Sequence, residues 1–124
     1  MPYSVLIADD AAFMREMLRE ILTGAGFRVV AEAEDGVQAV ASYREHQPDL
    51  VTLDIVMPRK SGIDTLREIR EADPNACVVM CSALGQEALV MEALDAGARD
   101  YVVKPFRADQ VLAAVTRAVQ KARE

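Results

Sequence analysis

Acidic, hydroxyl and ammonium side chains stand at the ends of the short apolar runs in this sequence. They are Asp9 and Asp10 after the first run, then Asp54, Ser82 and Lys104 at the ends of later ones. Carboxylates that lie close together raise one another's pKa and need a compensating cation. Mg²⁺ meets this need, because it takes oxygen ligands from one or two carboxylates together with phosphate oxygens and water. If the runs are neighbours in space, the pattern predicts a magnesium site.

Phosphoryl transfer is the chemistry that best fits this set of residues. A carboxylate can attack phosphorus and form an acyl phosphate. Asp54 is the natural nucleophile, since the end of an apolar strand would hold it rigidly and leave Asp9 and Asp10 for the metal. Mg²⁺ and Lys104 would neutralise charge on the equatorial phosphoryl oxygens, and the Ser82 hydroxyl would donate to one of them.

The elements that must position these residues follow from the hydrophobic pattern. Short β-rich runs predict strands at 5–8, 28–33, 50–54, 77–81 and 101–104. Apolar residues at helical spacing predict a helix from residue 13 to the glycines at 24–26, and others at roughly 36–46, 63–72, 86–96 and 108–121. This alternation predicts a doubly wound α/β domain with a parallel sheet covered on both faces. Function in such sheets collects at the carboxyl ends of the strands.

Each of these side chains also has an ordinary structural role open to it. Asp9 and Asp10 could cap a helix, and Asp54 and Ser82 could serve a turn or a local cap. Lys104 could be a solvated strand end whose stem packs on apolar surface. None of these roles explains why all five residues fall at the same edge of the predicted sheet.

Length and charge limit the remaining possibilities. The 124 residues, 52% hydrophobic and 27% charged, fit a single domain over 1–124 that needs no disulfide to fold. The net charge of −6 argues against nucleic acid or an anionic membrane surface as the main partner. No apolar run approaches the roughly 18 residues that cross a bilayer, and the N-terminus lacks the basic region of a secretory signal. We therefore expect a cytoplasmic domain, and we also expect it to be a monomer.

The whole chain resembles the receiver domain of two-component response regulators, and most of all the stand-alone chemotaxis regulators of bacteria outside the enteric group. The motifs that carry the resemblance are the acidic pair Asp9–Asp10, Asp54 in DIVMPRKSG, Ser82 in MCSALG, Tyr101, and Lys104–Pro105 in VVKPF. The resemblance implies a flavodoxin-like fold of five βα units with strand order 2-1-3-4-5.

The resemblance also implies a role for each of these residues. Asp54 would accept a phosphoryl group from the phosphohistidine of a sensor histidine kinase. Asp10 and Asp54 would bind Mg²⁺ directly, Asp9 through water, and Val56 through its backbone carbonyl. Lys104 would pair with the phosphoryl group and Asp54. The Lys104–Pro105 peptide bond would be cis. The domain would be a signalling protein that catalyses only its own phosphorylation and dephosphorylation.

The output of such a switch would leave the site through Ser82 and Tyr101. By resemblance, Ser82 moves toward the phosphoryl group and Tyr101 turns into the space that it leaves. A half-buried strand tyrosine with a satisfied hydroxyl is the alternative for Tyr101.

A surface for partner proteins is expected beside this switch. The residues 88–91 are all apolar and cannot all face one core, because successive helical residues turn by about 100°. Exposed apolar surface near Val90 or Met91, with Tyr101 and Val103, would bind a partner. The resemblance makes that partner the flagellar motor switch protein, and a phosphatase is a possible second one.

Two apolar residues beside the site bear on how long the phosphoryl group would last. Val56 lies two residues after Asp54, where the enteric regulator has a polar residue, and Leu84 lies two residues after Ser82. Neither side chain can orient a hydrolytic water, so we expect slow to moderate self-dephosphorylation.

Three other functions compete with a chemotaxis switch. A single-domain phosphorelay intermediate would use the same site. A flavodoxin-like electron carrier would need a hydroxyl- and glycine-rich loop after the first strand, and the residues at 9–12 are Asp-Asp-Ala-Ala. A Mg²⁺-dependent phosphatase would want a second acid two residues after its nucleophile, where Val56 stands.

Overall fold

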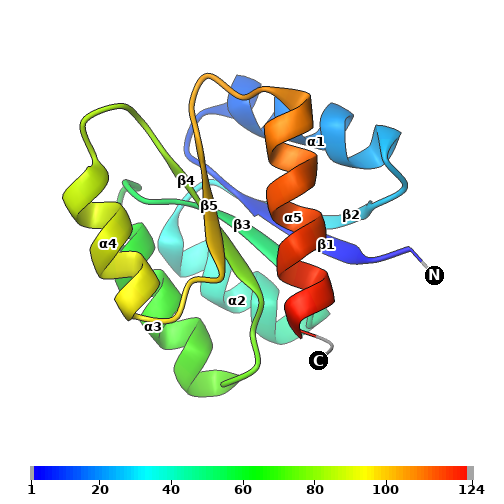
Figure 1. Ribbon diagram of the computed structural model, residues 1–124. Coiled ribbons are helices and arrows are strands. Elements are labelled where there is room, and N and C mark those ends of the chain that lie inside the picture. The colour runs from blue at the N-terminus through cyan, green and yellow to red at the C-terminus, as the bar shows by residue number, and fades with distance from the viewer. Residues whose placement is uncertain (1, 123–124) are drawn as a thin grey trace.

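The structure, a computed structural model, describes residues 2–122 (Figure 1). Within that range the strands are β1 (Ser4–Ala8), β2 (Arg28–Ala33), β3 (Leu50–Asp54), β4 (Val78–Ser82) and β5 (Asp100–Val103). The helices are α1 (Ala12–Gly24), α2 (Gly36–His46), α3 (Gly62–Ala72), α4 (Glu87–Asp95) and α5 (Ala108–Ala122). Every predicted strand and helix is present, with small shifts at the ends. The fourth strand includes Ser82, and the fifth ends one residue before Lys104.

The strands form one parallel sheet in the order β2-β1-β3-β4-β5. This confirms the doubly wound α/β architecture and the strand order that the resemblance implies. The chain continues from β1 to one side and from β3 to the other, so the loops after these two neighbouring strands diverge. Ligands of open α/β sheets bind in the crevice that such a reversal leaves.

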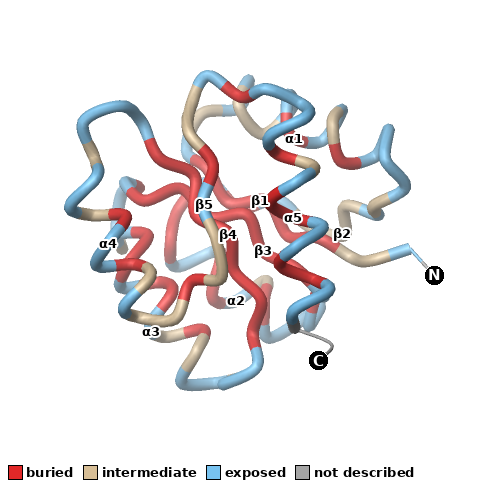
Figure 2. The backbone as a smooth tube through the Cα atoms, in the orientation of Figure 1, coloured by how far each residue is buried: buried red, intermediate tan, exposed pale blue. Residues whose placement is uncertain are grey.

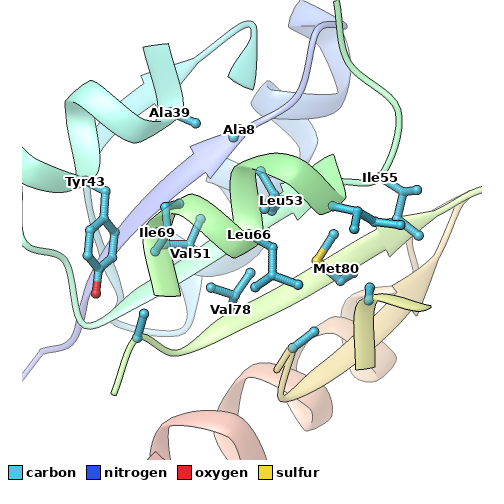
Figure 3. Close-up of a cluster of buried hydrophobic side chains, with 14 of the residues drawn as sticks. Ala8, Ala39, Tyr43, Val51, Leu53, Ile55, Leu66, Ile69, Val78 and Met80 are labelled. Atoms are coloured by element: carbon cyan, nitrogen blue, oxygen red, sulfur yellow. The ribbon is translucent and has the colours of Figure 1, made fainter. Parts of the chain in front are cut away.

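Helices cover both faces of the sheet (Figure 1). Side chains alternate along each strand, so adjacent strand residues enter different cores. Leu53 and Met80 lie in the core beneath α2, α3 and α4, which Figure 3 shows. Ile7 and Val79 lie in the core beneath α1 and α5. The central strands are therefore buried on both sides (Figure 2), and their ends are rigid supports for functional groups.

Local signals fix where several helices begin and end. The Asp35 side chain caps α2 by accepting the Gln38 N–H at 2.8 Å, and Ser61 caps α3 by accepting the Asp64 N–H at 3.1 Å. Gly26 and Gly97 follow α1 and α4 with φ of 94° and 111°, a backbone region that favours glycine. Among the described residues, no helix combines the length and apolar character needed to cross a membrane.

Candidate functional site

Three carboxylates meet at the carboxyl ends of β1 and β3. Asp9 and Asp10 directly follow β1, and Asp54 is the last residue of β3. One carboxylate oxygen of each lies within 4.8 Å of the others. The parallel register, which pairs Ala8 with Leu53, places the next residues, Asp9 and Asp54, at the same level. The structure thus brings together the acidic residues that the sequence placed at one edge.

Lys104 extends into this acidic cluster from the end of β5. Its Nζ lies 2.9 Å from Asp9 Oδ2 and 3.2 Å from Asp54 Oδ2. Its backbone N–H donates to the Ser82 carbonyl at 2.7 Å, which fixes the start of the side chain beside β4. The Lys104–Pro105 bond is cis, as the resemblance implies. The side chain is only 17% exposed, so Lys104 is not a solvated strand end.

Asp9 is held on several sides and is almost fully buried. Its N–H donates to the Ala33 carbonyl at 3.0 Å, and its Oδ1 accepts the Ala11 N–H at 2.9 Å. Its Oδ2 has the ammonium of Lys104 nearby, at an angle that leaves this oxygen without a directed hydrogen bond. Neither aspartate caps α1, since the N-cap residue is Ala11. The capping alternative for the acidic pair is therefore wrong.

Burial and neighbouring charges both act on the Asp54 carboxylate. Burial and the charge of Asp9 raise the pKa of Asp54 from its ordinary 3.8 to about 6, against the opposing effect of Lys104. A hydrogen bond from the Val56 backbone also lowers this pKa. Above about pH 6 the carboxylate is ionised, and an ionised carboxylate is the form that can attack phosphorus.

The remaining predicted residues surround Asp54. Ser82 is buried at the end of β4, where the register pairs its neighbour Cys81 with Asp54. Val56 and Leu84 lie on the loops after β3 and β4, and their side chains are 55% and 82% exposed. Both apolar side chains are therefore in contact with solvent, each two residues after a residue of the site.

Gly62 supports the site, although its role could not be predicted from the sequence. Its N–H donates to the Ile55 carbonyl at 2.7 Å. A Cβ at this position would lie 2.0 Å from the Asp54 carbonyl oxygen, which is far inside contact distance. Only glycine lets α3 start this close to the end of β3. The Ser61–Gly62 pair at the start of a helical pattern was the available signal, but it does not reveal the approach to Asp54.

An apolar hollow of about 480 Å³ lies beside the site, between β4, α4 and β5. Its lining includes Ser82, Leu84, Val90, Met91, Tyr101 and Val103. Met91 and Tyr101 are 60% and 43% exposed, but Val90 is only 7% exposed. The expectation that Val90 is surface is thus corrected: it packs against the core beneath α4, while Met91, one residue further around the helix, faces solvent.

The donor set fits a hard divalent cation. Three carboxylates supply oxygen atoms only, which is what Mg²⁺ takes from proteins. The Asp9 Oδ2 atom, buried without a directed hydrogen bond, has capacity for a further positive partner. Among the described residues, Lys104 is the ammonium that contacts these carboxylates, so a cation would offset the charge of Asp9, which after burial is the next cause of the raised pKa of Asp54.

Most of this sequence matches a known protein family. A family model for the response regulator receiver domain matches residues 5–116, and the chain belongs to that family. It is a phosphorylation-based signalling protein of two-component systems rather than a classical enzyme or a flavodoxin-like electron carrier.

Relatives and solved structures agree with this assignment. The chain is 56% identical to the chemotaxis protein CheY of Bacillus subtilis over 94% of this chain and 98% of that protein. It is 53% identical to CheY of Thermotoga maritima over 91% of this chain and 94% of that protein. It also superimposes on a chain of the CheX-CheY-BeF3-Mg+2 complex from Borrelia burgdorferi with a TM-score of 0.90 and 44% identity, covering 94% and 89% of the two chains.

Proposed function

We propose that this protein is a phospho-accepting switch of chemotaxis that takes a phosphoryl group from a sensor histidine kinase onto Asp54. The observation that carries the proposal is the Asp54 carboxylate, buried at the end of β3 between two further aspartates and the Lys104 ammonium. The similarity to CheY proteins over nearly the whole chain supports the role in chemotaxis. The proposal implies one receiver domain acting as a cytoplasmic monomer.

The transfer is a displacement at phosphorus, in which one bond forms and another breaks. An Asp54 carboxylate oxygen forms a bond to phosphorus while the bond from phosphorus to the kinase imidazole nitrogen breaks. The electron pair of the broken bond stays on that nitrogen. Lys104, 3.2 Å from Asp54 Oδ2, is in reach of an oxygen of the incoming group, and the Ser82 hydroxyl lies on the neighbouring strand to bond another.

Mg²⁺, when bound, supplies positive charge that neutralises the phosphoryl oxygens. Asp10 and Asp54 would hold it through side-chain oxygens, Asp9 through water, and Val56 through its carbonyl. Asp10 is exposed, so its carboxylate can bind a cation without first losing a buried partner. Asp9 keeps its contact with Lys104 in this arrangement, which suits an indirect role.

The signal would leave through the apolar hollow, because Ser82 belongs to both places. It stands one residue beyond the partner of Asp54 in β4, and it lines the hollow that Tyr101 and Met91 also line. A shift of the Ser82 side chain toward a phosphoryl group would open space next to Tyr101. We propose that the flagellar motor switch protein binds over this hollow, and that a phosphatase partner ends the signal.

Intact mass after incubation with acetyl phosphate and Mg²⁺ tests the acceptor. The wild type gains one phosphoryl mass and Asp54→Asn gains none. Asp95→Asn is the matched control, since Asp95 is exposed at the end of α4, away from the carboxyl edge. Labelling of Asp54→Asn at the wild-type level would refute the proposed acceptor.

Binding of the phosphorylated protein to a flagellar switch peptide tests the output surface. Met91→Asp is expected to weaken binding at least tenfold, because it places a charge at an apolar, 60% exposed position on the rim of the hollow. Met17→Asp, an exposed methionine on α1, is the control and should bind normally. If Met91→Asp and Met17→Asp bind the peptide with equal affinity, the hollow is not the partner surface. Met91 is a better probe than the buried Val90, where a charge would disturb folding.

A further inference from the structure

Arg15 holds the backbone of the acidic pair from α1. Its Nη1 donates to the Asp9 carbonyl oxygen at 2.7 Å, and its Nε bonds Glu32 Oε1 at 3.1 Å. The side chain is only 16% exposed, so this arginine is fixed between the loop after β1 and the edge strand β2. It therefore connects the loop that carries Asp9 and Asp10 to a rigid part of the sheet.

The bonded carbonyl belongs to the peptide unit that joins Asp9 to Asp10. A peptide unit is planar, so the direction of its C=O also sets the direction in which the next residue leaves. The Asp9 side chain and N–H are already held by Ala11 and Ala33. The bond from Arg15 is the one that orients the link to Asp10, whose exposed side chain has less packing to fix it.

We propose that Arg15 is a positioning residue for the metal site, which orients the Asp9–Asp10 peptide so that the Asp10 carboxylate faces Asp54. This inference rests on the proposed binding of Mg²⁺ by that cluster. Residues that orient metal ligands without touching the metal commonly change affinity about tenfold or more when they are replaced.

The direction in which Mg²⁺ affinity changes when Arg15 is replaced distinguishes a positioning role from an effect of its charge. Arg15 carries a positive charge near a cation site, so a purely electrostatic role predicts that its removal tightens Mg²⁺ binding. Positioning predicts the opposite. Arg19 is a matched control, because it bonds the other oxygen of Glu32 at 2.9 Å and lies one turn further along α1. Its replacement removes an equal charge and a bond to the same glutamate.

Isothermal titration calorimetry with MgCl₂ alone tests the proposal on the full chain. Arg15→Gln is expected to weaken Mg²⁺ binding about tenfold, and Arg19→Gln to stay within about twofold of wild type. In metal-free protein, the Asp10 amide resonance should move in Arg15→Gln and not in Arg19→Gln. Equal affinities for the two variants, or tighter binding by Arg15→Gln, would overturn the inference.

Two further measurements distinguish a loss of positioning in Arg15→Gln from a loss of folding. Urea unfolding in EDTA shows whether Arg15→Gln is folded, and if it is not, Arg15→Lys replaces it. Lysine has one donor nitrogen, so it cannot reproduce the planar fork with which arginine bonds the carbonyl and Glu32. Weakening of Mg²⁺ binding by about threefold in Arg15→Lys therefore supports the inference, and unchanged affinity opposes it. If the wild type itself binds no Mg²⁺, the proposed metal site fails along with the inference. If the wild type binds Mg²⁺ and the two variants bind it with equal affinity, the role of Arg15 is rejected but the metal site is not.

Discussion

Removing the charge of Asp54 should stabilise the metal-free protein at neutral pH. In the folded state the pKa of this carboxyl is raised to about 6, mainly by burial and then by the charge of Asp9, while 3.8 is the ordinary value that applies when the chain is unfolded. Folding therefore favours the protonated, neutral form. Above about pH 6 the folded protein must carry the carboxylate at a cost, and Asp54→Asn avoids that cost.

The size of the effect follows from the two pKa values. The interval between 3.8 and about 6, at about 1.4 kcal/mol per pH unit, corresponds to about 3 kcal/mol. The site opens to water on one side, and the asparagine amide is an imperfect partner for Lys104. We therefore expect a gain of about 2 kcal/mol in the free energy of unfolding at about pH 8.

The stability difference between Asp54→Asn and the wild type should depend on pH. The folded pKa is raised, so the favourable contribution of Asp54 is fully present below about pH 4 and is lost as the pH rises through about 6. The advantage of Asp54→Asn should be smallest at about pH 4, grow between about pH 4 and 6, and level off above that range. Urea unfolding in EDTA, followed by circular dichroism at several pH values, measures this difference. Asp95→Asn, at an exposed position, should show no such trend.

The same unfolding measurement can be repeated with Mg²⁺ in place of EDTA. A ligand that binds only the folded state at about ten times its dissociation constant adds about 1.4 kcal/mol. This gain should appear in the wild type and be much smaller in Asp54→Asn. An Asp54→Asn variant that is less stable than the wild type in EDTA at about pH 8, or a difference that does not change with pH, would refute the electrostatic account of the site.

Three further substitutions test other parts of the site. Val56→Asn should shorten the lifetime of the phosphoryl group several-fold, because an amide beside Asp54 can orient water; Val37→Asn, also exposed, is the control, and an unchanged decay of phosphoprotein would contradict the prediction. Lys104→Met should lower the free energy of unfolding in EDTA by about 3 kcal/mol, since it leaves the buried Asp9 and Asp54 without their cation. Urea unfolding measures this, with Lys121→Met at an exposed position as the control. Gly62→Ala should cost about 3 kcal/mol by the same assay, because its Cβ would overlap the Asp54 carbonyl. Gly24→Ala meets nothing within 4 Å and should be neutral or slightly stabilising, so equal effects of the two alanines would show that α3 can shift away.

The helices, the strands and the gathering of acidic residues at one edge of the sheet could all be predicted from the sequence. Apolar periodicity located every strand and helix, because burial on both faces of β3 and β4 requires runs that are largely apolar. Thr52 is a polar residue inside β3, but the charged residues Asp9 and Asp54 stand where the runs end, which is why their shared location could be predicted. The strand order came from the resemblance, since periodicity carries no information on which strands are neighbours.

The contacts between these groups depend on how the chain folds in three dimensions. Whether Lys104 contacts Asp9 as well as Asp54 depends on the path of the chain after β5, which no local pattern encodes. The burial of Val90 beside the exposed Met91 depends on how α4 is rotated against the sheet. The approach of Gly62 to Asp54 and the bond from Arg15 to the Asp9 carbonyl join residues through backbone atoms. Every residue has the same backbone groups, so such contacts leave little trace in the sequence.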